Sequence, residues 1–233
     1  VPPRFSRYKE ISKQVRAIFY EYTDLVEPLS LDEAYLDITV NKKGNPSATL
    51  VAEEIRQKIY ERVGLRASAG ISYNKFIAKI ASDINKPNGQ KTIPPEEAIE
   101  FLEKLDIKKF YGVGKVTATK MYNLGIFNGK HLKEKSIEYL TDHFGKSGGH
   151  YYKIVRGIHN SKVNPNHTPK SVAAEHTFPT NLTSEVFMME RLDKIADELE
   201  RRLKKSKLAG KTVTLKIKYS DFPQQQKSTK LAY

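Results

Sequence analysis

The sequence predicts a multidomain α+β protein: an α/β layer domain, then a compact all-α domain, then part of a second α+β domain. Three observations support this fold class. Helix-like and strand-like apolar patterns alternate up to about residue 93. Short helical segments punctuated by glycine then fill residues 106–157. A stretch with two prolines and no apolar period, residues 160–170, separates them from the remainder.

The first domain, residues 1–93, is expected to alternate helices and strands. Apolar residues three and four apart predict helices over residues 7–22, 47–63 and 74–84. Alternating apolar residues predict strands over residues 29–39 and 65–72. Ser47 is a typical N-cap and Gly64 a typical helix end. The inner face of the helix between them is expected to hold Leu50, Val51, Ile55 and Ile59.

The second domain, residues 94–159, is expected to be all-α and to begin with a short helix from the proline pair at 94–95 through Lys104. Residues 160–170 form a linker. In residues 171–233 we expect strands over 171–177 and 211–219, with an amphipathic helix between them. The second strand should turn Val213, Leu215 and Ile217 inward.

The formal net charge of +13 is carried almost entirely by the later part of the chain. Residues 1–105 hold 16 basic and 15 acidic side chains, residues 106–169 hold 11 and 4, and residues 170–233 hold 13 and 8. The near-neutral residues 1–105 favour chemistry that uses carboxylates. The basic residues 106–233 favour binding of a polyanion, most commonly nucleic acid. A generic lysine-rich surface is the alternative that charge alone leaves open.

Several classes are excluded by composition. The chain has no cysteine, which excludes disulfides, zinc ribbons, iron–sulfur clusters and cysteine nucleophiles. No run approaches the roughly 18 apolar residues of a membrane helix, and no signal segment opens the chain. We expect a soluble, intracellular protein. Because the sequence starts at Val1 and its last residues resume an apolar pattern, we also expect a piece of a longer chain.

The tract from Tyr111 to Met121 has the form of a helix-hairpin-helix turn. Gly112 and Gly114 allow a tight turn whose backbone N–H groups, at the start of a helix, suit a phosphate. Both glycines are expected to use conformations that a β-branched residue cannot easily enter. The apolar side chains expected to anchor the hairpin are Val113, Val116 and Met121. An ordinary interhelical turn is the alternative.

Asp32 and Glu33 adjoin a predicted strand and are flanked by apolar residues. Adjacent carboxylates can share a hard divalent ion such as Mg²⁺, and in a two-metal site they hold the oxygens of a phosphoryl transfer. A solvated turn is the alternative. Asp37, further along the strand, is expected to be exposed or hydrogen-bonded. Lys75 and Lys79 lie one helical turn apart, with exposure as their default, and the histidines show no metal-binding spacing.

These motifs resemble those of the Y-family translesion DNA polymerases. Residues 29–37, LSLDEAYLD, are similar to the family's second catalytic motif, and residues 67–71, 74–83 and 85–90 to its third. Residues 112–118, GVGKVTA, resemble its thumb hairpin. Residues 170–172 and 175–178 are similar to the start of its little finger, and the nearest likeness is to the bacterial DinB type.

The resemblance implies a partial palm over residues 1–93, a thumb over 94–159, a linker over 160–170 and a partial little finger over 171–233. It makes Asp32 and Glu33 catalytic and two of three metal-binding carboxylates, with two Mg²⁺ ions in the complete protein. Lys86 would contact the triphosphate of an incoming dNTP. The residues expected to hold primer-template DNA are Gly112, Val113, Gly114, Lys115, Thr117, Lys120, Lys216 and Lys218.

The resemblance also implies what this chain lacks and where its parent acts. The strand with the first catalytic carboxylate, the fingers, the rest of the little finger and the sliding-clamp tail are absent, so we expect no primer extension by the 233 residues alone. The parent is expected to be a bacterial cytoplasmic monomer, nucleoid-associated when acting, with a sliding clamp as partner and no membrane association.

Two rival functions stay open. One is a non-catalytic helix-hairpin-helix DNA-binding module, which explains the basic rear but not the Lys86 loop. The other is a nucleotide cyclase, whose two-metal core can resemble a polymerase palm, although the helical hairpin segment argues against it.

Overall fold

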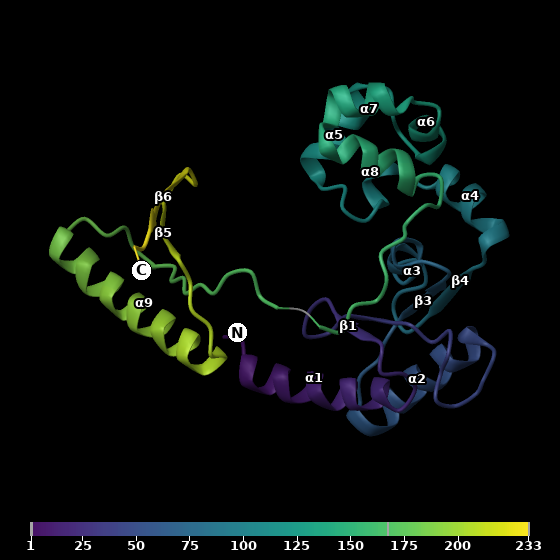
Figure 1. Ribbon diagram of the computed structural model, residues 1–233, viewed down its shortest axis with the longest axis horizontal. Helices are drawn as coiled ribbons and strands as arrows, with labels where there is room; N and C mark the ends of the chain where they lie inside the picture. The colour runs from purple at the N-terminus through teal and green to yellow at the C-terminus, as the bar shows by residue number, and fades with distance from the viewer. Residues whose placement is uncertain (1, 167, 233) are drawn as a thin grey trace. The chain divides into compact units, whose positions relative to one another are not determined.

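The computed structural model describes residues 2–166 and 168–232, and the chain divides into two units, residues 1–167 and 168–233 (Figure 1). The first unit holds two small sheets with their helices and a cluster of short helices. The second holds one long helix and a two-stranded sheet. Among the described residues, no helix is long and apolar enough to span a membrane.

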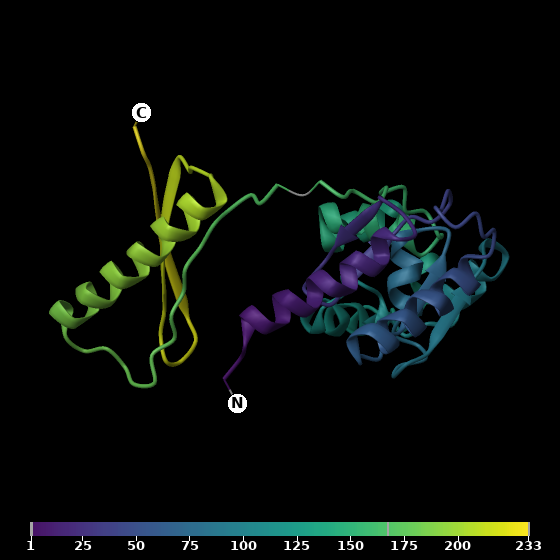
Figure 2. The same cartoon turned by 90° about the horizontal axis from the view of Figure 1, so that it is seen from below.

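The first unit begins with α1 (Phe5–Tyr20), β1 (Val26–Pro28), β2 (Ala34–Leu36) and α2 (Ala48–Val63). The strands β1 and β2 form an antiparallel hairpin in which Glu27 lies opposite Tyr35. The helices α1 and α2 pack on each other (Figures 1 and 2). Their shared core holds Ile18, Tyr22, Val51, Ile55 and Ile59. Apolar spacing therefore predicted both helices correctly.

The chain continues with β3 (Ala69–Ser72), α3 (Lys75–Ala81) and β4 (Gln90–Ile93). The two strands are parallel, with Ala69 opposite Gln90. Ser47 and Gly64 bound α2 as expected: Ser47 accepts from the Leu50 N–H, and Gly64 ends the helix at a φ of +70°. Asn74 caps α3 in the same way by accepting from the Ile77 N–H. These boundaries place the start of α3 directly after a strand.

Helices dominate from residue 95 onward: α4 (Pro95–Lys104), a 3₁₀ turn η1 (Ile107–Lys109), α5 (Lys115–Asn123), α6 (Gly129–Lys133), α7 (Ile137–Phe144) and α8 (Lys146–Ile154). This confirms the all-α prediction. One hydrophobic core runs from Phe76 and Ile77 of α3 through Leu102, Met121 and Leu140. The helices from α4 to α8 therefore share a core with α3 within the first unit.

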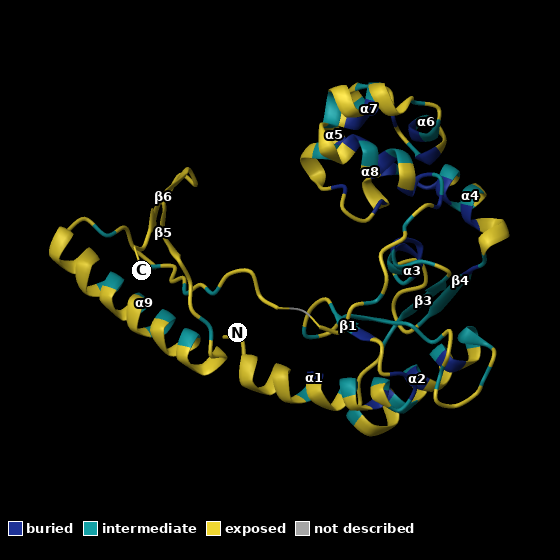
Figure 3. Cartoon of the chain, in the orientation of Figure 1, coloured by how far each residue is buried: buried dark blue, intermediate teal, exposed yellow. Residues whose placement is uncertain are grey.

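The second unit contains α9 (Glu185–Ser206), β5 (Thr212–Lys218) and β6 (Gln224–Lys230). The strands are antiparallel, with Thr212 opposite Lys230. Figure 3 shows buried residues concentrated in the first unit, whereas every residue of β5 and β6 is exposed. The predicted helix and strand are present in this unit.

Several expectations about elements were wrong. The strand expected over residues 171–177 is not formed in the described structure, and Val213, Leu215 and Ile217, which were expected to point inward, are between 42% and 51% exposed. Leu50 is 55% exposed, since α1 covers only one stripe of α2. Three strands were missed, β1, β4 and β6, because they are short or polar and lack alternating apolar residues.

Candidate active site

The turn between β1 and β2 presents the two adjacent carboxylates. Ser30 organises it: its Oγ donates to Asp32 Oδ1 at 2.6 Å and accepts from the backbone N–H groups of Asp32 and Glu33 at 3.3 and 3.1 Å. The Leu29 N–H donates to the Glu33 carbonyl at 2.9 Å, which closes the turn. Sequence analysis did not single out Ser30, although a serine two residues before an aspartate is a typical turn signal.

The helix α3 faces this hairpin with two lysines. Lys79 Nζ donates to Glu33 Oε1 at 3.0 Å, and Lys75 Nζ lies 2.8 Å from Glu27 Oε2. Their side chains are only 15% and 12% exposed, so the default of solvated lysines was wrong for both. The reason is their spacing: residues four apart share one helix face, and this face meets the hairpin.

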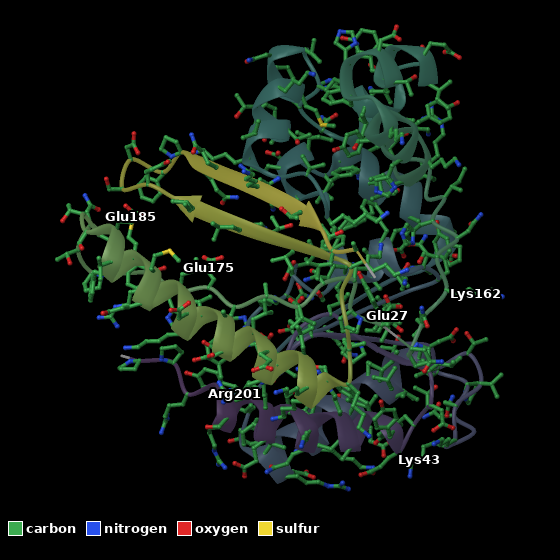
Figure 4. All side chains as sticks on the ribbon, turned by 60° about the vertical axis from the view of Figure 1, so that its left-hand side comes forward. Glu27, Lys43, Lys162, Glu175, Glu185 and Arg201 are labelled. Carbon is green, nitrogen blue, oxygen red and sulfur yellow. The ribbon has the colours of Figure 1, made fainter. Side chains whose placement is uncertain are left out.

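Lys75 and Glu27 also hold the start of the linker. Lys75 Nζ donates to the Lys162 carbonyl at 2.9 Å, and Glu27 Oε2 accepts from the Asn164 N–H at 2.7 Å. Figure 4 labels Glu27 and Lys162, which come from segments more than a hundred residues apart in the chain. Residues 162–164 are therefore fastened to the hairpin that carries the carboxylate turn.

Lys86 lies in the loop that follows α3. Arg56 of α2 donates to the carbonyls of Ala67 and Asn88 and to Gln90, and Asn85 Nδ2 donates to the Gln90 carbonyl, so this loop is fixed at both ends. Lys86 Nζ lies 2.5 Å from Asp83 Oδ1. Asp83 raises the pKa of Lys86 most, and the charges of Glu33 and Asp32 raise it further. Lys86 is thus within electrostatic reach of both carboxylates.

An open cavity of about 1680 Å³ gathers these groups. Its charged lining includes Asp32, Glu33, Lys79 and Lys86. Its apolar lining comes from both sheets, with Leu36 and Ile38 on one side and Ala69 and Ile71 on the other. The strand pairs β1–β2 and β3–β4 form separate sheets, and the cavity is lined by residues of both β2 and β3. Asp37 also lines it, with Oδ1 accepting from the Thr39 N–H at 3.0 Å, one of the two states expected for it.

The donor set suits part of a magnesium site. Asp32 and Glu33 offer the hard carboxylate oxygens that Mg²⁺ prefers. Within residues 2–166 and 168–232, however, no three His, Cys, Asp or Glu side chains converge as a metal cluster would require. The two acids fit as a partial ligand set.

The helix-hairpin-helix turn precedes α5. Gly112 has a φ of +89°, in the left-handed region that favours glycine, whereas Gly114 has an ordinary φ of −77°. The expectation that both need glycine's freedom was therefore wrong for Gly114. Its role differs: it is the N-cap of α5, it makes no side-chain cap, and a Cβ there would meet open space.

The anchors of this hairpin are Val113 and Met121, which are 8% and 0% exposed. The Val113 N–H is already used, since it donates to the Phe110 carbonyl at 3.0 Å. Val116 was wrongly expected to be an anchor. It is 84% exposed, because it lies on the side of α5 away from the core.

The lysines expected at DNA differ in their surroundings. Lys115 is exposed, and Thr117 is half-buried one turn from the N-cap. Lys120 instead donates to the His143 carbonyl and lies 5.0 Å from the Phe144 ring centre. Lys120 therefore stabilises the C-terminal end of α7 in this structure.

Lys216 and Lys218 lie on β5 in the second unit and are exposed, with Lys218 Nζ 4.8 Å from the Phe222 ring centre. Among the histidines, His159 is half-buried, and its Nδ1 is shielded from solvent. His167 lies outside the described residues.

Tyr111 connects the hairpin to the carboxylate turn. Lys79 Nζ lies 5.8 Å from its ring centre while bonding Glu33. Tyr35 of β2 lies nearby: burial raises its pKa most, and the Tyr111 hydroxyl adds to the rise. Sequence analysis missed both tyrosines as site residues, because nothing in their spacing indicates that the two segments meet.

A carboxylate turn, cationic groups from α3 and its loop, and a helix-hairpin-helix segment fit the class of nucleic-acid polymerase cores. Family models support this class. The impB/mucB/samB family matches residues 1–83, its C-terminal domain matches residues 169–233, and its HHH motif matches residues 95–126.

Curated relatives and solved structures agree. DNA polymerase IV 2 of Agrobacterium fabrum is 53% identical over 98% of this chain and 64% of its own length. DNA polymerase IV of Leptospira interrogans is 51% identical over 99% of this chain and 64% of its own length. A solved Y-family DNA polymerase chimera of Dbh and Dpo4 has a TM-score of 0.88 at 28% identity, covering all of this chain and 67% of its own.

The chain belongs to the impB/mucB/samB family, within the Y family of DNA polymerases, and is of the DinB type. It spans about 64% of the length of the curated relatives described above.

Proposed function

We propose that this chain is the catalytic-turn and DNA-gripping part of an error-prone translesion DNA polymerase, which performs templated, magnesium-dependent nucleotidyl transfer during DNA damage tolerance. One observation carries the proposal: Asp32, Glu33, Lys79 and Lys86 line one open cavity. This arrangement favours a polymerase over a non-catalytic hairpin module, which needs no such cavity. The same chain carries a helix-hairpin-helix segment. A nucleotide cyclase core does not need such a segment, so its presence favours a polymerase over a cyclase.

Within this site, Asp32 and Glu33 would hold Mg²⁺, two ions in the complete protein, and the ions would supply charge stabilisation for the oxygens of the transferred phosphoryl group. Ser30 fixes the Asp32 carboxylate by its 2.6 Å hydrogen bond. Lys79 Nζ donates to Glu33 Oε1 at 3.0 Å and so fixes the position of this carboxylate next to Asp32. Lys86 would bind the triphosphate of the incoming dNTP as a point charge on a flexible stem.

Primer-template DNA would be held by its backbone. The uncapped N-terminus of α5, with Gly114 open to close approach, suits a phosphate, and exposed Lys115 adds charge. Val113 contributes as an anchor, and Gly112 sets the turn. Thr117 and Lys120 lie further along the same helix. Lys216 and Lys218 would contact the duplex from the second unit.

The domain division follows the same proposal: palm over residues 1–93, thumb over 94–159, linker over 160–170 and little finger over 171–233. The complete protein would act as a monomer in the bacterial cytoplasm, at the nucleoid, with a sliding clamp as a further partner. The 233 residues alone would not extend primers, because only two of the three expected carboxylates are here.

The test combines two measurements on the 233-residue chain. Fluorescence anisotropy should show primer-template binding that falls steeply with salt and depends little on base sequence, because phosphate contacts release counterions. Primer extension with Mg²⁺ and dNTPs should be absent. Salt-insensitive binding would contradict the DNA grip, and extension that Asp32→Ala abolishes would contradict the expected inactivity.

A further inference from the structure

Lys86 is not directed to the carboxylate turn in this structure, although it lines the same cavity. Its Nζ lies 2.5 Å from Asp83 Oδ1, and Asp83 is also 3.9 Å from Lys79 Nζ. Lys79 in turn donates to Glu33. Acid and base therefore alternate along a row, Glu33, Lys79, Asp83 and Lys86. Glu33 is already paired with Lys79, so Asp83 is the acid that holds Lys86.

The backbone fixes Asp83 while Lys86 keeps its freedom. The Asp83 N–H donates to the Ile80 carbonyl at 3.1 Å, which extends the last turn of α3 beyond Ala81. Lys86 follows on the loop fixed by Arg56, with a side chain that is 51% exposed. A lysine has a flexible four-carbon stem, so its ammonium group can leave a carboxylate without any change in the backbone.

We propose that Asp83 is a positioning residue that holds Lys86 when no nucleotide is bound and gives it up when a triphosphate enters the cavity. This rests on the proposed role of Lys86 at the triphosphate. An exposed ion pair is weak, so the pair between Asp83 and Lys86 can form and break at a small cost in free energy. A polyphosphate carries several negative charges, whereas Asp83 carries one, so the polyphosphate attracts the Lys86 ammonium group more strongly. Asp83 therefore lowers the affinity for triphosphate and sets how readily the site releases it.

Tripolyphosphate, titrated without metal and followed by ³¹P NMR, tests this on the 233-residue chain. Asp83→Asn should bind it about two- to five-fold more tightly at low salt, the range expected for losing one exposed ion pair. Asp83→Glu keeps the acid and should return the affinity toward that of the unaltered chain. Lys86→Gln should weaken binding. Glu100→Gln is the matched control, because Glu100 forms a similar 2.5 Å ion pair with Lys104 on α4.

A double-mutant cycle distinguishes an effect of Asp83 through Lys86 from a general electrostatic effect of its negative charge on tripolyphosphate. If Asp83 acts through Lys86, the gain from Asp83→Asn should be largely lost in the Lys86→Gln background. An equal gain in both backgrounds overturns the inference, as does no gain at all in a chain whose binding still depends on Lys86. If Lys86→Gln leaves binding unchanged, the proposed triphosphate role of Lys86 fails, and the inference fails with it.

Discussion

Lys79 Nζ lies 3.0 Å from Glu33 Oε1, so a helix of the third motif holds one of the two carboxylates of the second. The lysine is 15% exposed, and the ring centre of Tyr111 of the hairpin lies 5.8 Å from its Nζ. A single amine thus joins the carboxylate turn, α3 and the start of the helix-hairpin-helix turn. It also competes with any cation for the same oxygen.

We therefore expect Lys79→Gln to raise the affinity of the chain for Mn²⁺ about two- to five-fold, because a competing positive charge is removed from a partly exposed carboxylate. Mn²⁺ titration followed by electron paramagnetic resonance measures this. Lys104→Gln, a charge removal on the outer face of α4, should leave the affinity unchanged. Weaker Mn²⁺ binding in Lys79→Gln would show that the lysine orients Glu33 for the metal more than it competes.

The two hairpin glycines should respond differently to substitution. Gly112→Ala should destabilise the first unit by about 1 kcal/mol, because φ there is +89° and a Cβ is disfavoured. Gly114→Val should leave stability nearly unchanged, since φ is −77° and the space around a Cβ is open. It should nevertheless weaken DNA binding several-fold by blocking phosphate approach.

Thermal denaturation and DNA anisotropy, measured on both glycine variants, separate the two roles. Val116→Ala is a suitable control, because Val116 is an exposed residue of the same turn region. DNA affinity that Gly114→Val leaves unaltered would argue against backbone contact at α5.

The linker attachment predicts a change in protease sensitivity. Glu27→Gln removes the charge that Lys75 faces and weakens the acceptor of the Asn164 N–H, so residues 162–164 should detach more often. We expect trypsin to cut after Lys162 about three- to ten-fold faster, read by mass spectrometry, if the lost pair is worth on the order of 1 kcal/mol. Glu103→Gln, which breaks the 2.7 Å pair with Lys133, should not change cleavage at Lys162. Equal rates at Lys162 in the unaltered chain and in Glu27→Gln would contradict the attachment.

His159 predicts a loss of stability in mild acid. Burial lowers its pKa most, with smaller effects from the nearby charges of His150 and Lys75, and its buried Nδ1 has no partner among the described residues. The unfolded chain, whose histidine pKa is about 6.5, therefore binds the proton more readily than the folded chain. The stability that the folded chain gains from keeping His159 neutral is fully present above about pH 6.5, and it is lost as the pH falls below that value.

The melting temperature of the unaltered chain should accordingly fall between pH 7.5 and pH 5.5, and His159→Gln should reduce that fall. His131→Gln, a histidine change elsewhere in the same unit, serves as the comparison. A pH dependence that His159→Gln does not alter would assign the acid sensitivity to other groups.

The sequence by itself determined the elements that depend on local chemistry. The cap Ser47, the helix end Gly64 and the apolar stripe of α2 all act within a few residues, so their pattern predicted this helix. The motifs likewise identified Asp32, Glu33 and Lys86 as candidate site residues, and the family followed from them. The polar strand β6 was not predicted, because its pairing with β5, rather than its own composition, makes it a strand.

Only the tertiary structure decided which charges meet. Glu33 and Lys79 are 46 residues apart, and Glu27 and Asn164 are 137 residues apart. No local pattern records such pairs, since they form only when the folded chain brings α3 and the linker within hydrogen-bond reach of the β1–β2 hairpin. The same packing turned Lys75 and Lys79, which were expected in solvent, into partners of carboxylates. Ion pairing between distant segments follows from packing, and packing depends on the whole chain.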